Sequence, residues 1–248
     1  MRLSVIGLIA ATFLSATAIQ STAIAATAIG KVAATLGAPP ASGPGGDRDL
    51  KAGAAVFEDD KIVVRNGNAQ IILNDGTKLV VGPDSTLVLD RFLMKGGSSA
   101  EKVSIKALRG TFRFITGRSA KSAYDIQTAN ATIGIRGTGF DFWSKQVTGA
   151  AVMEGSINLC HDNTCVAVHQ GCEVGRASNS ESRLLQGRAK GGAMAQNLPY
   201  VQSQNALKTA FHLPIGDCKS SLPNSFTGEG GAEKPEQNNG GDDYNDRG

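Results

Sequence analysis

Histidine and aromatic side chains are scarce in this chain of 248 residues, which has three histidines and 5% aromatic residues. No serine lies in a Gly-x-Ser-x-Gly motif, and no Asp-x-Asp-x-Asp-Gly pattern offers a calcium loop. The basic residues are neither clustered nor interleaved with aromatic residues, as they are in nucleic-acid interfaces. These absences argue against an enzyme and against nucleic acid as a partner. We therefore expect no catalytic residue, no resident metal and no cofactor.

Two small groups of side chains keep a metal site open as an alternative. The acidic run Glu58–Asp60 precedes an expected strand, and we interpret it as an exposed turn rather than as a source of calcium ligands. His161 and His169 lie near Asp162 and two cysteines. We interpret these histidines as solvated side chains rather than as metal ligands.

Long apolar runs are also lacking, apart from one at the N-terminus. The run from Leu3 to Leu14 follows Met1-Arg2 and is shorter than the ~20 residues that a membrane-spanning helix needs. Small residues follow it and end in Ala23-Ile24-Ala25, the A-x-A pattern that signal peptidase cleaves. No cysteine follows the run, which argues against a lipoprotein. We expect a signal peptide at residues 1–25, with an uncleaved anchor as the alternative, and a periplasmic or secreted product.

Cysteine is absent from the first half of the chain. The four cysteines are Cys160, Cys165, Cys172 and Cys218. In an exported protein they favour disulfides, and four cysteines permit three pairings. The stretch "INLCHDNTCVAV" indicates a hairpin that places Cys160 opposite Cys165, which leaves Cys172 to pair with Cys218. A metal site is the alternative, but a C-x4-C spacing is not typical of structural zinc.

Short runs rich in Val, Ile, Leu and Thr dominate the chain from Val56 onward, separated by turn residues. Examples are "KIVVRNG", "NAQIILNDG" and "TKLVVGPD". Asp75-Gly76 predicts a hairpin with a type I′ turn. We expect an all-β fold over residues 26–176, a two-sheet sandwich or solenoid-like domain of short antiparallel strands.

The last part of the chain has a different texture. Residues 177–218 are expected to form an extension with one short helix that begins at Pro199, tied to the β domain by the Cys172–Cys218 disulfide. Residues 219–248 form a polar, Gly-rich and Asn-rich acidic tail that we expect to be disordered.

The stretch "TANATIGIRGTGFDFW", residues 128–143, contains three glycines within six residues. Apolar residues occupy odd positions from Ala129 to Ile135 but even positions at Phe140 and Phe142. A strand that keeps its apolar face buried across this change needs an extra residue, which is a β-bulge. The spacing does not match a phosphate-binding loop, and no helix is expected to follow. We assign a structural bend to Gly134, Gly137 and Gly139.

The same residues carry a family resemblance. "DIQTANATIGIRGTGFDFW" resembles the signature of FecR-type domains, and "AAVMEGSINLC" is similar to a later strand of that family. The resemblance extends over about residues 29–174. One departure is Ala129-Asn130, where the family usually has a proline after the signature threonine.

The resemblance implies a sensory role. Full-length FecR proteins have a cytoplasmic segment that acts on a sigma factor, a membrane helix, and a periplasmic domain that senses an outer-membrane receptor. Here the domain directly follows the expected signal peptide, so we expect no direct contact with a sigma factor.

Two functions remain open. The first is a non-catalytic recognition module that binds an envelope protein, such as an outer-membrane receptor or a membrane sensor, through Arg136, Thr138 and Asp141. These side chains have an internal interpretation too, in which Arg136 pairs with an acid and Thr138 bonds across the bend. The second is a structural or glycan-binding envelope protein that self-associates through sheet edges.

Overall fold

The computed structural model describes residues 26–223. The expected signal peptide at 1–25, and residues 224–248 of the tail expected at 219–248, lie outside the described residues. Residues 219–223 are ordered instead, and Leu222 among them is buried in a hydrophobic cluster. In the described part, no helix is long and apolar enough to cross a membrane.

Fifteen strands form one sheet in the described part of the chain. They are β1 (Ala28–Leu36), β2 (Pro40–Ser42), β3 (Arg48–Asp49), β4 (Ala55–Phe57), β5 (Lys61–Val64), β6 (Asn68–Leu73), β7 (Lys78–Val81), β8 (Ser85–Gly96), β9 (Ser99–Ile115), β10 (Tyr124–Thr128), β11 (Thr132–Ser144), β12 (Thr148–His161), β13 (Thr164–His169), β14 (Glu173–Ala177) and β15 (Ser182–Leu185). The all-β expectation is confirmed, and β15 carries the sheet beyond residue 176.

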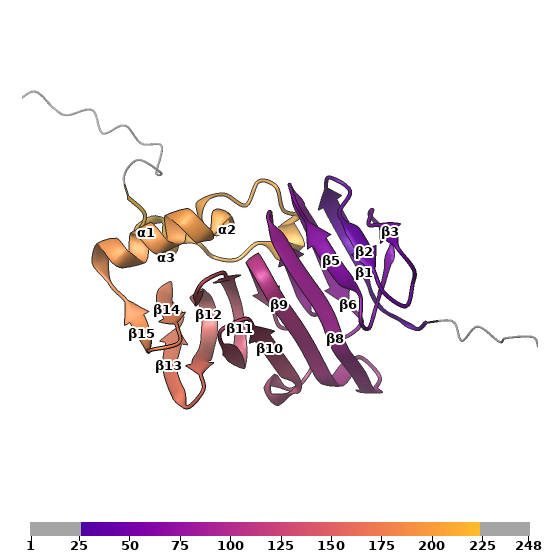
Figure 1. Ribbon diagram of the computed structural model, residues 1–248, viewed down its shortest axis with the longest axis horizontal. Coiled ribbons are helices and arrows are strands. Elements are labelled where there is room, and N and C mark those ends of the chain that lie inside the picture. The colour runs from indigo at the N-terminus through magenta and orange to yellow at the C-terminus, as the bar shows by residue number, and fades with distance from the viewer. Residues whose placement is uncertain (1–25, 224–248) are drawn as a thin grey trace, which may run out of the picture.

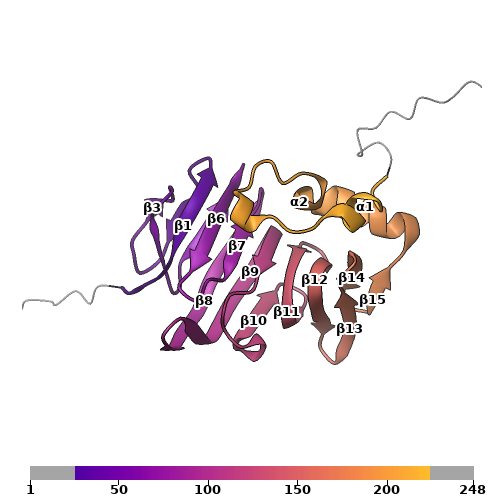
Figure 2. The same cartoon turned by 180° about the vertical axis from the view of Figure 1, so that it is seen from behind.

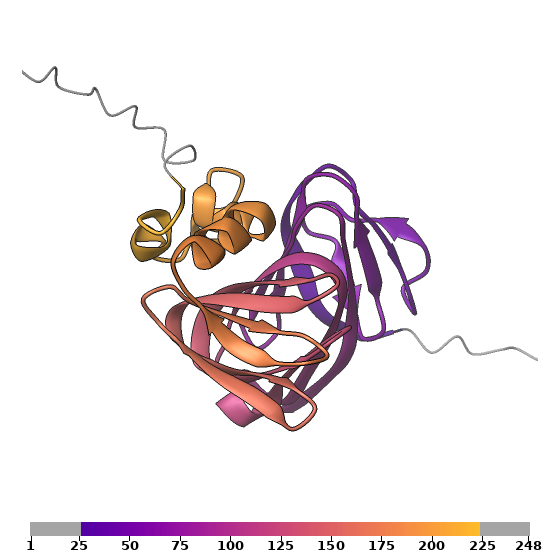
Figure 3. The ribbon, with the colours of Figure 1, turned by 60° about the vertical axis from the view of Figure 1, so that its left-hand side comes forward.

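The main path through the sheet runs β15-β14-β12-β11-β10-β9-β7-β6-β1-β4. Most of these strands are labelled in Figure 1, and β7 is labelled in Figure 2. Neighbours are antiparallel except β9 and β10, which are parallel. The first part of β9 pairs with β8 and β10, and its last part, from Gly110, pairs with β7 and β11. This long strand therefore connects two parts of a sheet that rolls around a common interior, as Figure 3 shows.

The interior of the roll holds the main hydrophobic core, in which the aromatic rings of β9 and β11 lie together. The ring centroids of Phe112 and Phe142 are 5.0 Å apart, and those of Phe114 and Phe140 are 5.6 Å apart. All four side chains are at most 1% exposed. These rings place Phe140 and Phe142 inside, as the change in alternation predicts.

Residues 187–223, which we call the C-terminal cover, lie on the outside of the sheet (Figures 1 and 2). The cover contains α1 (Gly187–Asn197), α2 (Pro199–Gln202) and α3 (Gly216–Lys219), with a 3₁₀ turn at Thr209–Phe211. A second cluster of buried residues packs between it and the sheet, including Trp143, Met194 and Leu213. The predicted helix does begin at Pro199 but has four residues, and the longer α1 was not expected from the sequence.

The hairpin between β6 and β7 differs from the predicted turn. Asn74, Asp75 and Gly76 form a three-residue loop, in which the Gly76 N–H donates to the Leu73 carbonyl at 2.9 Å. Only Gly76 has a positive φ, of 88°, whereas a type I′ turn requires two such residues. Asp75 instead turns its carboxylate inward and is fully buried.

Candidate functional site

The bend in β11 is a pair of β-bulges against β12. Ile135 pairs with Ile157 and Thr138 with Gly155, so β11 has one extra residue between these pairs. Gly137 has a φ of 86° and Gly155 a φ of 73°, a conformation that side-chain-bearing residues rarely adopt. A Cβ atom at Gly155 would also overlap the carbonyl oxygen of Gly137. This corner is therefore fixed by two facing glycines, one of which the sequence pattern did not single out.

The other two glycines assigned to the bend have different roles. Gly134 lies before the bulge in regular pairing, has no positive φ, and would have only ordinary contacts if it carried a Cβ. Gly139 is covered by Leu213 of the C-terminal cover, and a Cβ atom there would overlap that side chain. The assignment of Gly134 to the bend is therefore wrong, and Gly139 gives room to the cover.

The three polar side chains expected at the corner point to different environments. Arg136 is exposed, and it has no ion pair among residues 26–223. Thr138 is 6% exposed, and its hydroxyl donates to the carbonyl of Glu154. Its backbone carbonyl accepts from the N–H of Thr116 at 3.0 Å. Thr138 thus bonds across the bend, and it cannot be a surface contact in this conformation.

Asp141 is fully buried and pairs with Arg113, its direct neighbour across β9 and β11. Arg113 Nε lies 2.6 Å from Asp141 Oδ1, and Nη2 lies 2.9 Å from Oδ2. Both side chains lie on the outer face of the sheet, because their neighbours in the sequence on either side are phenylalanines that point inward. The expectation that Asp141 contacts a partner is wrong, because the C-terminal cover closes this face.

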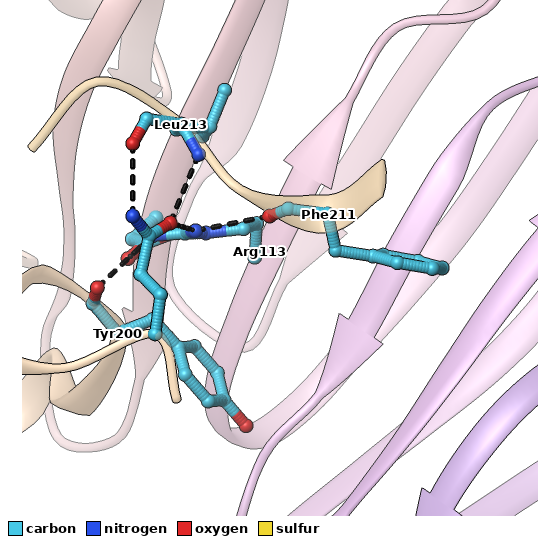
Figure 4. Close-up of polar contacts among 6 residues, drawn as sticks. Arg113, Tyr200, Phe211 and Leu213 are labelled. Atoms are coloured by element: carbon cyan, nitrogen blue, oxygen red, sulfur yellow. Dashed lines mark hydrogen bonds and ion pairs between the residues drawn. The ribbon is translucent and has the colours of Figure 1, made fainter. Parts of the chain in front are cut away.

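Arg113 connects the sheet to the cover with all its remaining donors (Figure 4). Nη1 donates to Gln204 Oε1 and, at 3.1 Å, to the carbonyl of Phe211. Nη2 donates to the carbonyl of Tyr200 at 3.3 Å. Together with the two bonds to Asp141, these use the five N–H groups of a guanidinium. Arg113 therefore has no donor left for a ligand.

Two glutamine side chains hold the backbone of the cover in a similar way. Gln204 accepts from the Leu213 N–H and donates to the Leu213 carbonyl, both at 2.9 Å. Gln70 of β6 donates to the Ala206 carbonyl at 3.1 Å and accepts from the Lys208 N–H at 2.8 Å. Side-chain amides thus take the place of a neighbouring strand along this segment.

Comparison with known proteins places this corner in a family. Residues 60–158 match the model of the FecR protein family. The chain contains a FecR-type domain. This confirms the resemblance that the stretch around Gly137 suggested, and no curated protein matched the chain.

Two solved structures are similar to the chain at low identity. Both are crystal structures of a candidate anti-sigma factor from Parabacteroides distasonis, at 2.50 Å and 1.65 Å resolution. The identities are 17% and 15%, with TM-scores of 0.42 and 0.40. Each comparison covers 55% of this chain and 64% of the other, so the chain spans less than two thirds of that protein's length.

The FecR domain as matched contains the corner and the Arg113–Asp141 pair, whereas the cover and all four cysteines follow it. The structure pairs Cys160 with Cys165 and Cys172 with Cys218, the pairs indicated by the hairpin pattern. The second disulfide joins α3 to the sheet just before β14. The sheet is therefore joined to the cover twice, by Arg113 within the FecR domain and by a covalent bond from Cys172 after it.

Buried acids of the FecR domain are occupied by internal partners. Asp60 pairs with Arg48 and accepts the Phe57 N–H at 2.8 Å. Glu58, two residues earlier, accepts the Phe92 N–H at 2.9 Å. The acidic run forms a turn as expected, but only Asp59 in it is exposed. Asp75 Oδ2 accepts from the hydroxyls of Thr77, Ser119 and Tyr124. These carboxylates hold loops in place and do not line a reactive cleft.

Burial also sets the ionisation of the groups around Arg113. Burial raises the pKa of Asp141, and the guanidinium of Arg113 acts against that rise. Burial, reinforced by the charge of Asp141, raises the pKa of Tyr200 well above its ordinary value. The Tyr200 hydroxyl is also one of two buried polar side-chain atoms in the described chain that lack a hydrogen-bond partner, the other being Thr111 Oγ1. Burial thus favours the neutral form of the Tyr200 hydroxyl.

The histidines lie at the periphery of the fold. His161 Nδ1 is 2.7 Å from the Asn130 carbonyl and Nε2 is 3.3 Å from Asp162 Oδ2. His169 Nδ1 lies 3.2 Å from Glu173 Oε2. Within residues 26–223 no three His, Cys, Asp or Glu side chains are grouped as metal ligands.

Arg113, Gln204 and Gln70 are the residues that sequence analysis missed. Arg113 lies between Phe112 and Phe114, so alternation does predict that it faces out of the core. What alternation does not predict is that a segment about ninety residues later covers that face, as the 91-residue separation of Arg113 and Gln204 shows.

Proposed function

We propose that the protein is a non-catalytic recognition module of the cell envelope that binds a protein partner through the corner of its FecR domain. The observation that carries this proposal is the exposure of Arg136 at a corner whose other polar side chains are used internally. Of Arg136, Thr138 and Asp141, only Arg136 is exposed.

The corner suits recognition because it is rigid. The facing bulges at Gly137 and Gly155 fix the backbone, and the cover packs on Gly139 from the other side. A side chain presented by a rigid backbone loses less conformational freedom on binding than one on a mobile loop. The guanidinium of Arg136 fits a carboxylate of the partner, with which it forms two parallel hydrogen bonds.

A second cation lies at the same corner, against Gly137. The side chain of Lys121 lies against Gly137, where a Cβ atom would overlap it. The contact surface thus presents positive charge, which supports an acidic patch on a protein partner such as an outer-membrane receptor or a membrane sensor. The expected signal peptide and the FecR match support a location in the periplasm.

The test is site-specific photo-crosslinking from position 134 in the tagged, exported protein, followed by mass spectrometry. Position 134 is exposed on β11, two residues before Arg136, so the crosslinker leaves Arg136 in place. We expect one dominant envelope protein, and Arg136→Ala should lower its recovery about tenfold, the effect of losing one charge-assisted contact of about 1.4 kcal/mol. Arg65→Ala is the matched control, because Arg65 is an exposed arginine on the turn before β6. Recovery of only copies of the chain or cell-wall fragments would instead favour a structural envelope protein.

A further inference from the structure

The outer edge of β8 has no strand partner over its last residues. β5 pairs with β8 only from Ser85 to Val88, whereas β9 pairs with it as far as Gly96. Next along the edge, Leu89 exchanges backbone hydrogen bonds with Asp59 and Asp60. From Leu93 to Gly96, no strand of the described chain continues the sheet on this side. This end of the hairpin lies on the side of the molecule opposite α1 and α2 (Figures 1 and 2).

Glu58 provides a hydrogen-bond acceptor for one backbone N–H group of this edge. Its carboxylate accepts the N–H of Phe92 at 2.9 Å, in the place where the carbonyl of a neighbouring strand would accept it. A free strand edge is a template for pairing with another extended chain. The carboxylate satisfies one position, and the edge beyond Phe92 stays open.

An apolar pocket of about 500 Å³ lies beside the open edge. Its apolar lining includes Ile29, Phe57, Phe92 and Met94. Met94 is 40% exposed and Leu93 is 45% exposed. A register shift between these two residues leaves both of them in solvent. The edge thus combines unpaired backbone N–H and C=O groups with exposed apolar side chains. A strand end that only faces solvent would not require this combination.

The rim of the pocket is acidic. Glu58 and Asp59 both line it, Asp59 is exposed, and neither forms an ion pair with a described cation. A ligand that fills the pocket therefore gains from a positive charge next to its apolar side chain.

We propose that the β8 edge and this pocket dock an extended segment of a partner protein, which carries an apolar side chain next to a lysine or arginine. The segment adds a strand to β8 and places its apolar side chain against Phe92 and Met94. A lipid surface fits less well, because it offers no partners to the free N–H and C=O groups of the edge.

This surface does not include Arg136, so it goes beyond the corner proposed above, and either can fail without the other. The probe is a fluorescein-labelled peptide, Lys-Val-Lys-Val-Lys-Val-Lys, titrated against the exported protein by fluorescence anisotropy. Binding should be saturable and should slow amide exchange at Leu93–Gly96. Met94→Ser should weaken it about tenfold, while Leu36→Ser, at another exposed hydrophobic residue, and Arg136→Ala should leave it unchanged.

Four further measurements distinguish a peptide strand from the other possible occupants. A fully N-methylated peptide should not bind, because it has no backbone N–H groups to donate to the edge of β8. A peptide with glutamate in place of lysine should bind at least about tenfold more weakly. Equal binding of either peptide would overturn the proposal. So would a dimer in analytical ultracentrifugation that Met94→Ser abolishes, which would assign the edge to a second copy. Co-sedimentation with phosphatidylethanolamine–phosphatidylglycerol vesicles that Leu93→Ser abolishes would assign it to lipid.

Discussion

Replacing Asp141 with alanine leaves the guanidinium of Arg113 buried without its carboxylate. The two side chains are 0% and 1% exposed, so solvent does not screen them. Breaking a buried ion pair by removing one partner costs about 3–5 kcal/mol, because an uncompensated charge stays in the interior. Domains have a free energy of unfolding of about 5–15 kcal/mol, so Asp141→Ala should remove a large part of the stability.

The single tryptophan makes the assay direct. Trp143 is 3% exposed and belongs to the cluster between the sheet and the cover, so its fluorescence reports on docking of the cover as well as on unfolding. With an m-value of about 2 kcal/mol/M, the urea midpoint should fall by about 1.5–2.5 M. Asp90→Ala is the control, because Asp90 pairs with Lys106 on the surface and should cost less than about 1 kcal/mol.

A double variant separates the ion pair from the connection to the cover. Arg113→Met with Asp141→Leu leaves no buried charge, and such replacements are often neutral in other proteins. Here the carbonyls of Tyr200 and Phe211 would lose their donor, at about 1–3 kcal/mol for each group left unsatisfied, whereas Gln204 Oε1 keeps the N–H of Leu213. We expect only partial recovery of the midpoint. Full recovery would refute the reasoning, and so would an Asp141→Ala midpoint within about 0.5 M of the parent, which corresponds to about 1 kcal/mol.

Three further predictions use matched variants. Tyr200→Phe should stabilise the fold by about 1 kcal/mol at pH 7, because it removes a hydroxyl buried without a partner, whereas Tyr124→Phe should destabilise it, because its hydroxyl donates to Asp75. Burial raises the pKa of both tyrosines, so above about pH 10 the folded state binds more protons than the unfolded state. Stability should therefore fall as the pH rises past that value. Each Phe variant should make this fall less steep in thermal melts. Gly155→Ala should lower the free energy of unfolding by at least about 1–2 kcal/mol, because of the left-handed backbone alone. Gly134→Ala should change it by no more than about 0.5 kcal/mol in urea unfolding. Equal losses for the two variants would contradict the bulge geometry. Cys218→Ser opens a loop whose ends are 46 residues apart and should cost about 4 kcal/mol, measured by calorimetry, with limited proteolysis expected to cut the cover first; an unchanged melting temperature would show that the disulfide adds nothing.

The strands and the bulge could be predicted from the sequence because they depend on local alternation. The change from odd to even apolar positions between Ile135 and Phe140 requires an extra residue wherever one face is buried. Alternation also gives the face on which Asp141 lies, because it stands between Phe140 and Phe142. Whether that face meets solvent depends on a distant segment, and for this reason the expected surface contact proved to be an internal ion pair.

Helix α1 could not be predicted because its stability comes from packing. Its sequence, GRAKGGAMAQN, includes three glycines, and Gln186 makes no side-chain cap. Gly191 is needed where α1 approaches the Ser221 carbonyl, and Met194 is fully buried against the sheet. Neither contact can be predicted from the local sequence, in which glycine has a low helix propensity.

The connections made by the C-terminal cover also set an order of events. Arg113 reaches Phe211 over 98 residues, and Gln70 reaches Lys208 over 138 residues. A chain that is made N-terminus first can complete its rolled sheet while the outer face of β7, β9 and β11 is still exposed to solvent. The cover then closes that face, and the Cys172–Cys218 disulfide holds it in place. A copy that ends before the cover would expose Arg113, Asp141 and Trp143 to proteases.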